Sequence, residues 1–209
     1  MKNPWEDISL ADYEGHMSLG CVGQLQAVNA MMKEQFEACP AGTAMVLGVA
    51  GGNGLEHVRR GKYRALYAVD INEDYLKAVS ERYADLAGVV KCLRLDLTRE
   101  PQKLPHADLV IADLLIEYIG CAAFREAVRH AGPRYVSCAV QVDAGGDAWV
   151  SNSPYLHAFD ALEGIHRRID EGELEEAMEE IGFAGVLREE TALPNGKKLL
   201  RLDFKKKAL

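Results

Sequence analysis

Four apolar runs in the sequence are each followed by residues that can hold a polar ligand. The first run leads into the glycine-rich segment 48–54, where backbone amides can approach an anion without clashes from Cβ atoms. The next three runs end in Asp70, Asp96 and Asp113. A carboxylate in the place of Asp70 can accept hydrogen bonds from both hydroxyls of a ribose. One in the place of Asp96 can accept a hydrogen bond from an exocyclic amine. The pattern indicates a ligand that contains a nucleoside.

The apolar runs are spaced as strands that alternate with helices. Five of them are predicted strands, at 44–49, 65–69, 89–95, 108–112 and 135–140. Asn72 is a predicted N-cap for a helix between the second and third strands, and another helix follows the fourth. Alternating units of this kind form a parallel sheet with helices on both faces. Because parallel strands end at one edge of a sheet, we expect the glycine segment and the three aspartates to meet there.

The end of the chain breaks this alternation. A helix is predicted over 173–181, followed by strand-like runs at 183–191 and 197–204. The Pro-Asn-Gly sequence at 194–196 favours a turn, so these two runs are predicted to form an antiparallel hairpin. The expected fold class is therefore α/β, with a Rossmann-like, seven-stranded, mostly parallel sheet, an antiparallel C-terminal hairpin and an N-terminal helix.

Two segments lie outside the alternating units. Apolar residues at helical spacing from Leu19 to Phe36 predict one long helix that begins near Met17. We expect residues 1–40 to form a helical lid over the ligand. The segment 143–170 is long for a connection inside a compact domain, so it is predicted to be an insertion that forms part of the binding site. The whole chain, 1–209, has the length of a single domain.

The glycine segment and the aspartates after the next three strands resemble the class I S-adenosylmethionine-dependent methyltransferases over about residues 43–205. The resemblance implies S-adenosylmethionine as cofactor and S-adenosylhomocysteine as product. It implies that Asp70 binds the ribose and that Asp96, with an apolar neighbour, holds the adenine. Asp113 and Leu114 would line the methionine end, with Gly52 and Gly54 as the glycines closest to the cofactor. The implied cofactor-binding set is Gly48, Ala50, Gly51, Gly52, Asn53, Gly54, Asp70, Ile71, Asp96, Leu97, Asp113 and Leu114.

The first strand departs from the family pattern at two positions. Gly48 stands where the family has an acidic residue, and Ala50 replaces the first glycine of the loop. A non-catalytic protein that binds the same cofactor therefore stays open as an alternative function. A nicotinamide dehydrogenase is a further alternative, although the pattern GxGxxG does not fit this segment.

The residues that can act on a methyl acceptor lie near the fourth strand and in the two outlying segments. Glu117 and His16 are the candidate catalytic groups, because each can take or orient a proton. Tyr13, Tyr118, Tyr155 and His157 are the candidate substrate contacts. The remaining histidines, including His166, are predicted to be surface residues. The motif Asp113-Leu-Leu-Ile is not the Pro-Pro-aromatic motif of amino-directed DNA methyltransferases, so the expected transfer is to O, N or S of a small molecule.

Composition narrows the class of partner. The chain has 32 acidic and 24 basic residues and a net charge of −8, which disfavours nucleic acid. No apolar stretch reaches the length of a membrane span, and the first residues have no signal-peptide core. The five cysteines include no CxxC pair, and the histidines show no ligand spacing, so no metal site is expected. These features predict a cytoplasmic enzyme that acts on a small molecule; they give no oligomeric state.

Overall fold

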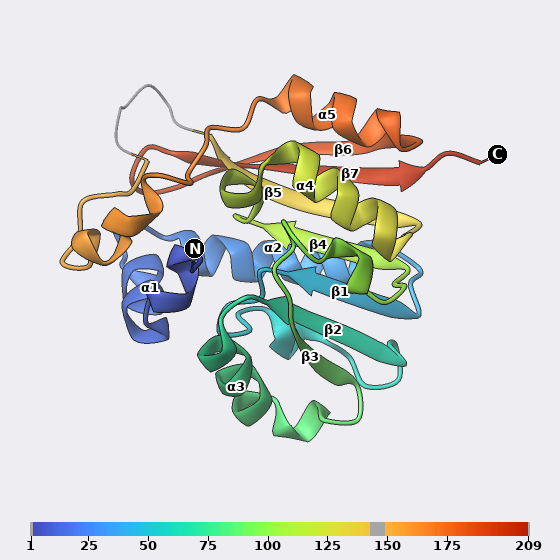
Figure 1. Cartoon of the computed structure of the whole chain (residues 1–209), viewed down its shortest axis with the longest axis horizontal. Coiled ribbons are helices and arrows are strands. Elements are labelled where there is room, and N and C mark those ends of the chain that lie inside the picture. Colours follow the sequence, from blue (N-terminus) through green and yellow to red (C-terminus); the bar gives the residue numbers. More distant parts are fainter. Residues whose placement is uncertain (1, 143–148, 209) are drawn as a thin grey trace.

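The computed structural model describes residues 2–142 and 149–208. Within these residues the chain forms one seven-stranded sheet with the order β3-β2-β1-β4-β5-β7-β6 (Figure 1). Strands β1 to β5 pair in parallel, whereas β7 pairs antiparallel with both β5 and β6. This confirms the predicted sheet and its closing hairpin. The strands are β1 Thr43–Leu47, β2 Ala65–Asp70, β3 Val90–Arg94, β4 Leu109–Asp113, β5 Tyr135–Val142, β6 Phe183–Ala192 and β7 Lys198–Lys206.

Alternate residues of β1 enter two different cores. Ala44 and Val46 pack with apolar residues of α2 and α3 on one face of the sheet. Met45 and Leu47 pack with those of α4 and α5 on the other face. Both faces are therefore covered, as the continuous apolar runs predicted. The α-helices are α1 Leu10–Ser18, α2 Gln24–Ala38, α3 Glu73–Arg82, α4 Ile116–Ala131 and α5 Glu171–Glu180, and α4 is kinked at Gly120.

The N-terminal region differs from the single helix predicted to begin near Met17. It consists of the 3-10 turn η1 (Pro4–Asp7) and two separate helices, α1 and α2. Gly23 directly precedes α2 and interrupts the helical conformation between the two helices, because its φ of 68° is left-handed, a conformation that favours glycine. Helix α2 contributes Met32 and Phe36 to the sheet core. The turn η1 and helix α1 lie near the edge where the parallel strands end (Figure 1), and the first turns of α2 line pockets at the same edge, so a lid formed by residues 1–40 stays a prediction.

The predicted insertion lies beside α1, insofar as the structure describes it. Residues 143–148 of that prediction lie outside the described residues. In the remainder, the 3-10 segment η5 (Leu156–Leu162) buries Phe159 and Leu162 against Ile8, which precedes α1. Across residues 2–142 and 149–208, none of the helices has the length and hydropathy needed to cross a membrane.

Candidate functional site

Three cavities lie side by side where the parallel strands end. We name them by their residues: the Asp70 pocket, of about 690 Å³, the glycine-loop pocket, of about 490 Å³, and the Glu117 pocket, of about 500 Å³. Each volume includes the open mouth of the pocket. Tyr13 of α1 and Leu114, directly after β4, line all three cavities. The three spaces therefore meet around these two side chains.

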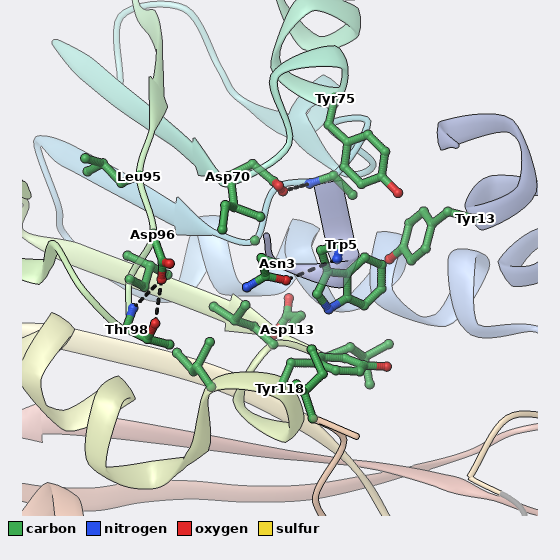
Figure 2. Close-up of a pocket in the computed structure, with 18 residues that line it drawn as sticks. Asn3, Trp5, Tyr13, Asp70, Tyr75, Leu95, Asp96, Thr98, Asp113 and Tyr118 are labelled. Carbon is green, nitrogen blue, oxygen red and sulfur yellow. Dashed lines mark hydrogen bonds between the residues drawn. The ribbon is translucent and has the colours of Figure 1, made fainter. Parts of the chain in front are cut away.

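The Asp70 pocket brings together most of the predicted cofactor residues. Asp70, Asp96 and Asp113 lie on the ends of neighbouring segments, and Trp5 and Tyr13 reach over them from the N-terminal region (Figure 2). The other predicted residues on its wall are Gly48, Ala50, Ile71, Leu97 and Leu114. Gly51 and Asn53 line the glycine-loop pocket instead.

Gly52 and Gly54 line none of these three pockets. A Cβ on Gly52 would meet the Tyr83 ring at 2.7 Å, and one on Gly54 would meet the Met32 sulfur at 2.6 Å. Both glycines have a positive φ as well. These glycines make room for side chains of the protein, so the prediction that they approach a ligand is not supported by their placement.

Asp70 is fixed by the loop that it supports. Its Oδ2 accepts a hydrogen bond of 2.9 Å from the Ala50 amide, and its Oδ1 accepts one of 2.9 Å from the Asn72 amide. The side chain is buried, and burial raises its pKa to about 6. Each carboxylate oxygen can accept a second hydrogen bond, so Asp70 remains able to accept two hydroxyls from the pocket.

Asp96 is held by its own turn. Its Oδ1 accepts hydrogen bonds of 2.9 Å from the Thr98 amide and 2.6 Å from the Thr98 hydroxyl (Figure 2). Its Oδ2 lies 3.5 Å from Nε of Arg99. This Asx turn fixes the direction of the carboxylate on the wall of the Asp70 pocket.

Asp113 retains an unpartnered oxygen at the centre of the site. Its Oδ1 accepts a hydrogen bond of 2.8 Å from Nε2 of Gln35 in α2, whereas its Oδ2 is buried without a hydrogen-bond partner. Burial raises the pKa of Asp113 to about 7. A buried unpaired acceptor costs about 1–3 kcal/mol, which a donor from a bound cation would recover. Asp113 lines both the Asp70 and the glycine-loop pockets.

Two residues beside these pockets hold a backbone conformation that L-residues rarely adopt. Ala50 has a φ of 46° and Leu114 a φ of 55°. The left-handed conformation costs a non-glycine residue about 1–2 kcal/mol. Such strain concentrates at functional sites.

Glu117 and His16, the two candidate catalytic residues, share the Glu117 pocket. Glu117 is 3% exposed, and its Oε1 accepts a hydrogen bond of 2.6 Å from the Gln141 amide while its Oε2 has no partner. Burial, and then the charge of Asp113, raise its pKa to about 7. His16 Nδ1 lies 2.8 Å from the Ser153 hydroxyl. Burial and the nearby Lys197 lower the pKa of His16 below its usual value.

The predicted substrate contacts divide into two groups. Tyr13 lines all three pockets, and Tyr118 lines the Asp70 and Glu117 pockets. Tyr155 lines none of the three and packs over Gly15 of α1, where a Cβ would meet its ring at 2.5 Å. His157 is exposed, with its Nδ1 3.2 Å from Asp160. The structure does not place Tyr155 or His157 at the site.

Several residues of the site were missed by sequence reasoning. Trp5 lines the Asp70 and Glu117 pockets. Its backbone is held there because Asn72 Nδ2 donates a hydrogen bond of 2.9 Å to the Trp5 carbonyl. His166, predicted to be a surface residue, is half-buried and stacks on Trp149 with centroids 4.1 Å apart. Gln35 is 1% exposed and orients Asp113. Gln35 could have been noticed in the sequence, because it is a polar residue within the predicted amphipathic helix. Trp5 and His166 had no such signal.

Helix α1 is tied to the glycine loop by a latch of three residues. Arg82 of α3 pairs with Glu14 of α1, and its Nη1 also donates to the Gly51 carbonyl over 3.0 Å. A Cβ on Gly51 would collide with the Glu14 carboxylate, so a larger residue at position 51 would displace the Glu14 and Arg82 side chains from this arrangement. The latch closes α1 over the glycine-loop pocket, which Glu14 also lines.

We predict that the latch holds α1 in a region that opens locally. Arg82→Gln is expected to speed hydrogen exchange of the α1 amides about 2- to 5-fold without ligand, because exposed ion pairs contribute about 0.2–1 kcal/mol. S-adenosylhomocysteine is expected to slow this exchange in both proteins. Arg60→Gln is the matched control, since Arg60 makes the same two kinds of bond to Asp85 away from the site. Equal α1 exchange in all states would identify α1 as permanent scaffold.

No protein-family model matches the sequence, and no curated protein matches it. Solved structures do match. The [4+2]-cyclase SpnF superposes with a TM-score of 0.65 at 12% identity, over 88% of this chain and 82% of its own. Magnesium protoporphyrin IX methyltransferase (ChlM) from Synechocystis PCC 6803 with bound S-adenosylhomocysteine superposes with a TM-score of 0.62 at 11% identity, over 93% of this chain and 87% of its own. The N-terminal domain of EvdMO1, in the presence of S-adenosylhomocysteine and D-fucose, superposes with a TM-score of 0.62 at 14% identity, over 88% of this chain and 83% of its own. The chain has the class I methyltransferase fold, as the resemblance implied.

Proposed function

We propose that the protein transfers a methyl group from S-adenosylmethionine to a small molecule. The observation that carries the proposal is that three cavities meet at Tyr13 and Leu114. A sulfonium has three substituents, here an adenosyl group, a methionyl chain and the methyl group. A site for methyl transfer therefore needs three spaces that join at one point, with the acceptor in the third.

The residues present fit the cofactor. Asp70 has spare acceptor capacity for the two ribose hydroxyls, and Asp96 stands on the same wall for the adenine amine. The unpartnered Oδ2 of Asp113 suits the ammonium of the methionine part. Glu14 of α1 also lines the glycine-loop pocket, but its carboxylate is paired with Arg82. Asp113 is therefore the group that would supply the negative charge that the resembling family places at the position of Gly48.

The Glu117 pocket is the space proposed for the acceptor. Bound S-adenosylmethionine supplies an activated methyl group, so the protein need only align the nucleophile and exclude water. Tyr118 and Trp5 separate this pocket from the Asp70 pocket, and Glu117 Oε2 is free to accept a proton from the acceptor. His16 stands on the same wall as a second group that can orient the acceptor. A pocket of this size lined by aromatic rings supports a small molecule as the acceptor.

Ligand-dependent stability tests the cofactor. We expect S-adenosylhomocysteine at about 100 times its dissociation constant to add about 2.7 kcal/mol to the free energy of unfolding, a rise of roughly 5–10 °C in Tm for a chain of this size. NAD at the same concentration is expected to leave Tm unchanged, because the glycine segment lacks the dinucleotide pattern. A Tm unchanged by either S-adenosyl compound at millimolar concentration would contradict the proposal.

The departures at Gly48 and Ala50 favour one second candidate, a protein that binds the cofactor without methyl transfer. SpnF, named as a [4+2]-cyclase, has the same fold. Incubation with labelled S-adenosylmethionine and candidate acceptors separates the two. Binding together with labelled product supports the transferase, whereas binding with no labelled product from any acceptor favours the second candidate.

A further inference from the structure

The Glu117 pocket is walled by aromatic rings in contact with one another. Trp5 and Tyr118 meet edge to face with centroids 4.8 Å apart. Tyr118 also meets His166 at 5.6 Å, and His166 stacks on Trp149. Phe159 adds a further ring next to His16. Such walls bind a flat apolar ring well and also attract a cation through the faces of the rings.

The charge in this pocket is of one sign. Among the described residues that line it there is no lysine or arginine. The nearest basic group that acts on His16 is Lys197, whose ammonium donates to the Trp149 carbonyl. Glu117 is the acidic group on the wall, and Asp113 lies near enough to affect its charge. An acceptor that carries a carboxylate or phosphate would face Glu117 and would meet no lysine or arginine among the described residues that line this pocket.

Glu117 is positioned to hold a donor from the acceptor. The Gln141 amide fixes Oε1 at 2.6 Å, so the carboxylate cannot turn away, and Oε2 is left without a partner. A buried carboxylate oxygen without a donor, surrounded by rings, has the chemistry that recognises an ammonium group. A neutral hydroxyl would satisfy the hydrogen bond but would gain nothing from the negative charge of the ionised carboxylate.

Building on the methyl transfer proposed above, we infer that the acceptor is an amine carried by a flat aromatic ring, held as an ammonium by Glu117. The ammonium passes one proton to Glu117 Oε2, which makes the nitrogen lone pair available. That lone pair forms the new bond to the methyl carbon, while the bond from carbon to sulfur breaks and its electron pair stays on sulfur. The products are a methylammonium and a thioether, and the proton on Glu117 leaves to solvent.

A matched set of probes tests the amine assignment. Tryptamine, tryptophol and indole-3-propionate present the same ring with an amine, a hydroxyl and a carboxylate, and each is titrated by calorimetry with and without saturating S-adenosylhomocysteine. Tryptamine is expected to bind at least tenfold more tightly than either analogue. Glu117→Gln is expected to weaken tryptamine about 30-fold or more, as loss of one partner of a buried charge pair does, and to leave tryptophol unchanged.

Two further variants keep the test decisive. Glu126→Gln makes the same chemical change on an exposed part of α4 and is expected to bind tryptamine normally. Trp149→Leu removes one ring and is expected to weaken tryptamine about 3- to 10-fold while leaving the affinity for S-adenosylhomocysteine unchanged. Circular dichroism and thermal unfolding confirm that each variant is folded.

The outcomes separate this inference from the proposed function. Equal or tighter binding of tryptophol or indole-3-propionate, no binding of any probe, or undiminished tryptamine binding by folded Glu117→Gln protein would overturn the amine assignment even where S-adenosylhomocysteine binds. Tryptamine selectivity without any S-adenosylhomocysteine binding would overturn the methyl transfer and leave the amine site standing.

Discussion

The Glu117→Gln protein is expected to transfer methyl groups about 10²- to 10⁴-fold more slowly than the unaltered chain, while it binds S-adenosylhomocysteine with unchanged affinity. The substitution preserves the size of the side chain and an acceptor for the Gln141 amide. It removes the oxygen that can accept the proton of an acceptor, Oε2, which has no other partner. The rate is measured as S-adenosylhomocysteine formed from saturating S-adenosylmethionine and an amine acceptor.

The pH dependence of the same rate distinguishes a proton acceptor from a structural residue. The pKa of Glu117 is raised to about 7, so the unaltered protein should gain activity as the pH rises from 6 to 8. The Gln variant should lose this dependence, and Glu126→Gln should keep it. Full activity in folded Glu117→Gln protein would remove Glu117 from the catalytic step.

Raising the pH from 5.5 to 8 is expected to destabilise the unliganded protein and to strengthen S-adenosylmethionine binding. Burial raises the pKa of Asp70 to about 6 and the pKa values of Asp113 and Glu117 to about 7. The folded state therefore binds more protons than the unfolded state over this range. The contribution of these groups to the free energy of unfolding is fully present below about pH 4. It is lost as the pH rises through their folded pKa values of about 6 and 7. Each unit of raised pKa corresponds to about 1.4 kcal/mol, so the combined loss amounts to several kcal/mol.

A bound cation reverses this effect, because it favours the ionised carboxylates. The increase in Tm caused by S-adenosylmethionine should thus be larger at pH 8 than at pH 5.5, and calorimetry in buffers of different ionisation enthalpy should detect proton release on binding near pH 6.5. Asp113→Asn is expected to reduce both effects, which separates them from the general influence of net charge. Affinity that is equal at the two pH values would show that Asp113 does not face the cation.

The sheet and its strand-end carboxylates were predictable because their signals are local. A run such as 44–47 is apolar without interruption, since alternate residues enter cores on opposite faces of the sheet. Asp70, Asp96 and Asp113 follow such runs, and the topology of parallel strands brings them to one edge. The Pro-Asn-Gly turn placed the antiparallel hairpin for the same reason.

The upper wall of the site was not predictable, because contacts between distant segments create it. Trp5 is held by Asn72, and the stack of His166 on Trp149 joins residues that no periodic pattern relates. The continuous apolar spacing around Gly23 concealed the break between α1 and α2, which depends on one left-handed backbone angle. The close approach of Gly52 and Gly54 to the cofactor stays a prediction, because a glycine pattern does not reveal whether a ligand or a side chain needs the space.

A crystal structure of the protein with bound S-adenosylhomocysteine tests most directly the claim that three cavities serve the three arms of a sulfonium. We expect the sulfur between Tyr13 and Leu114, the ribose on Asp70, and the amino group on Asp113 Oδ2. The side of the sulfur without a carbon substituent should face the Glu117 pocket. A sulfur that lies away from Tyr13 and Leu114, or one that faces solvent rather than the Glu117 pocket, would contradict the account.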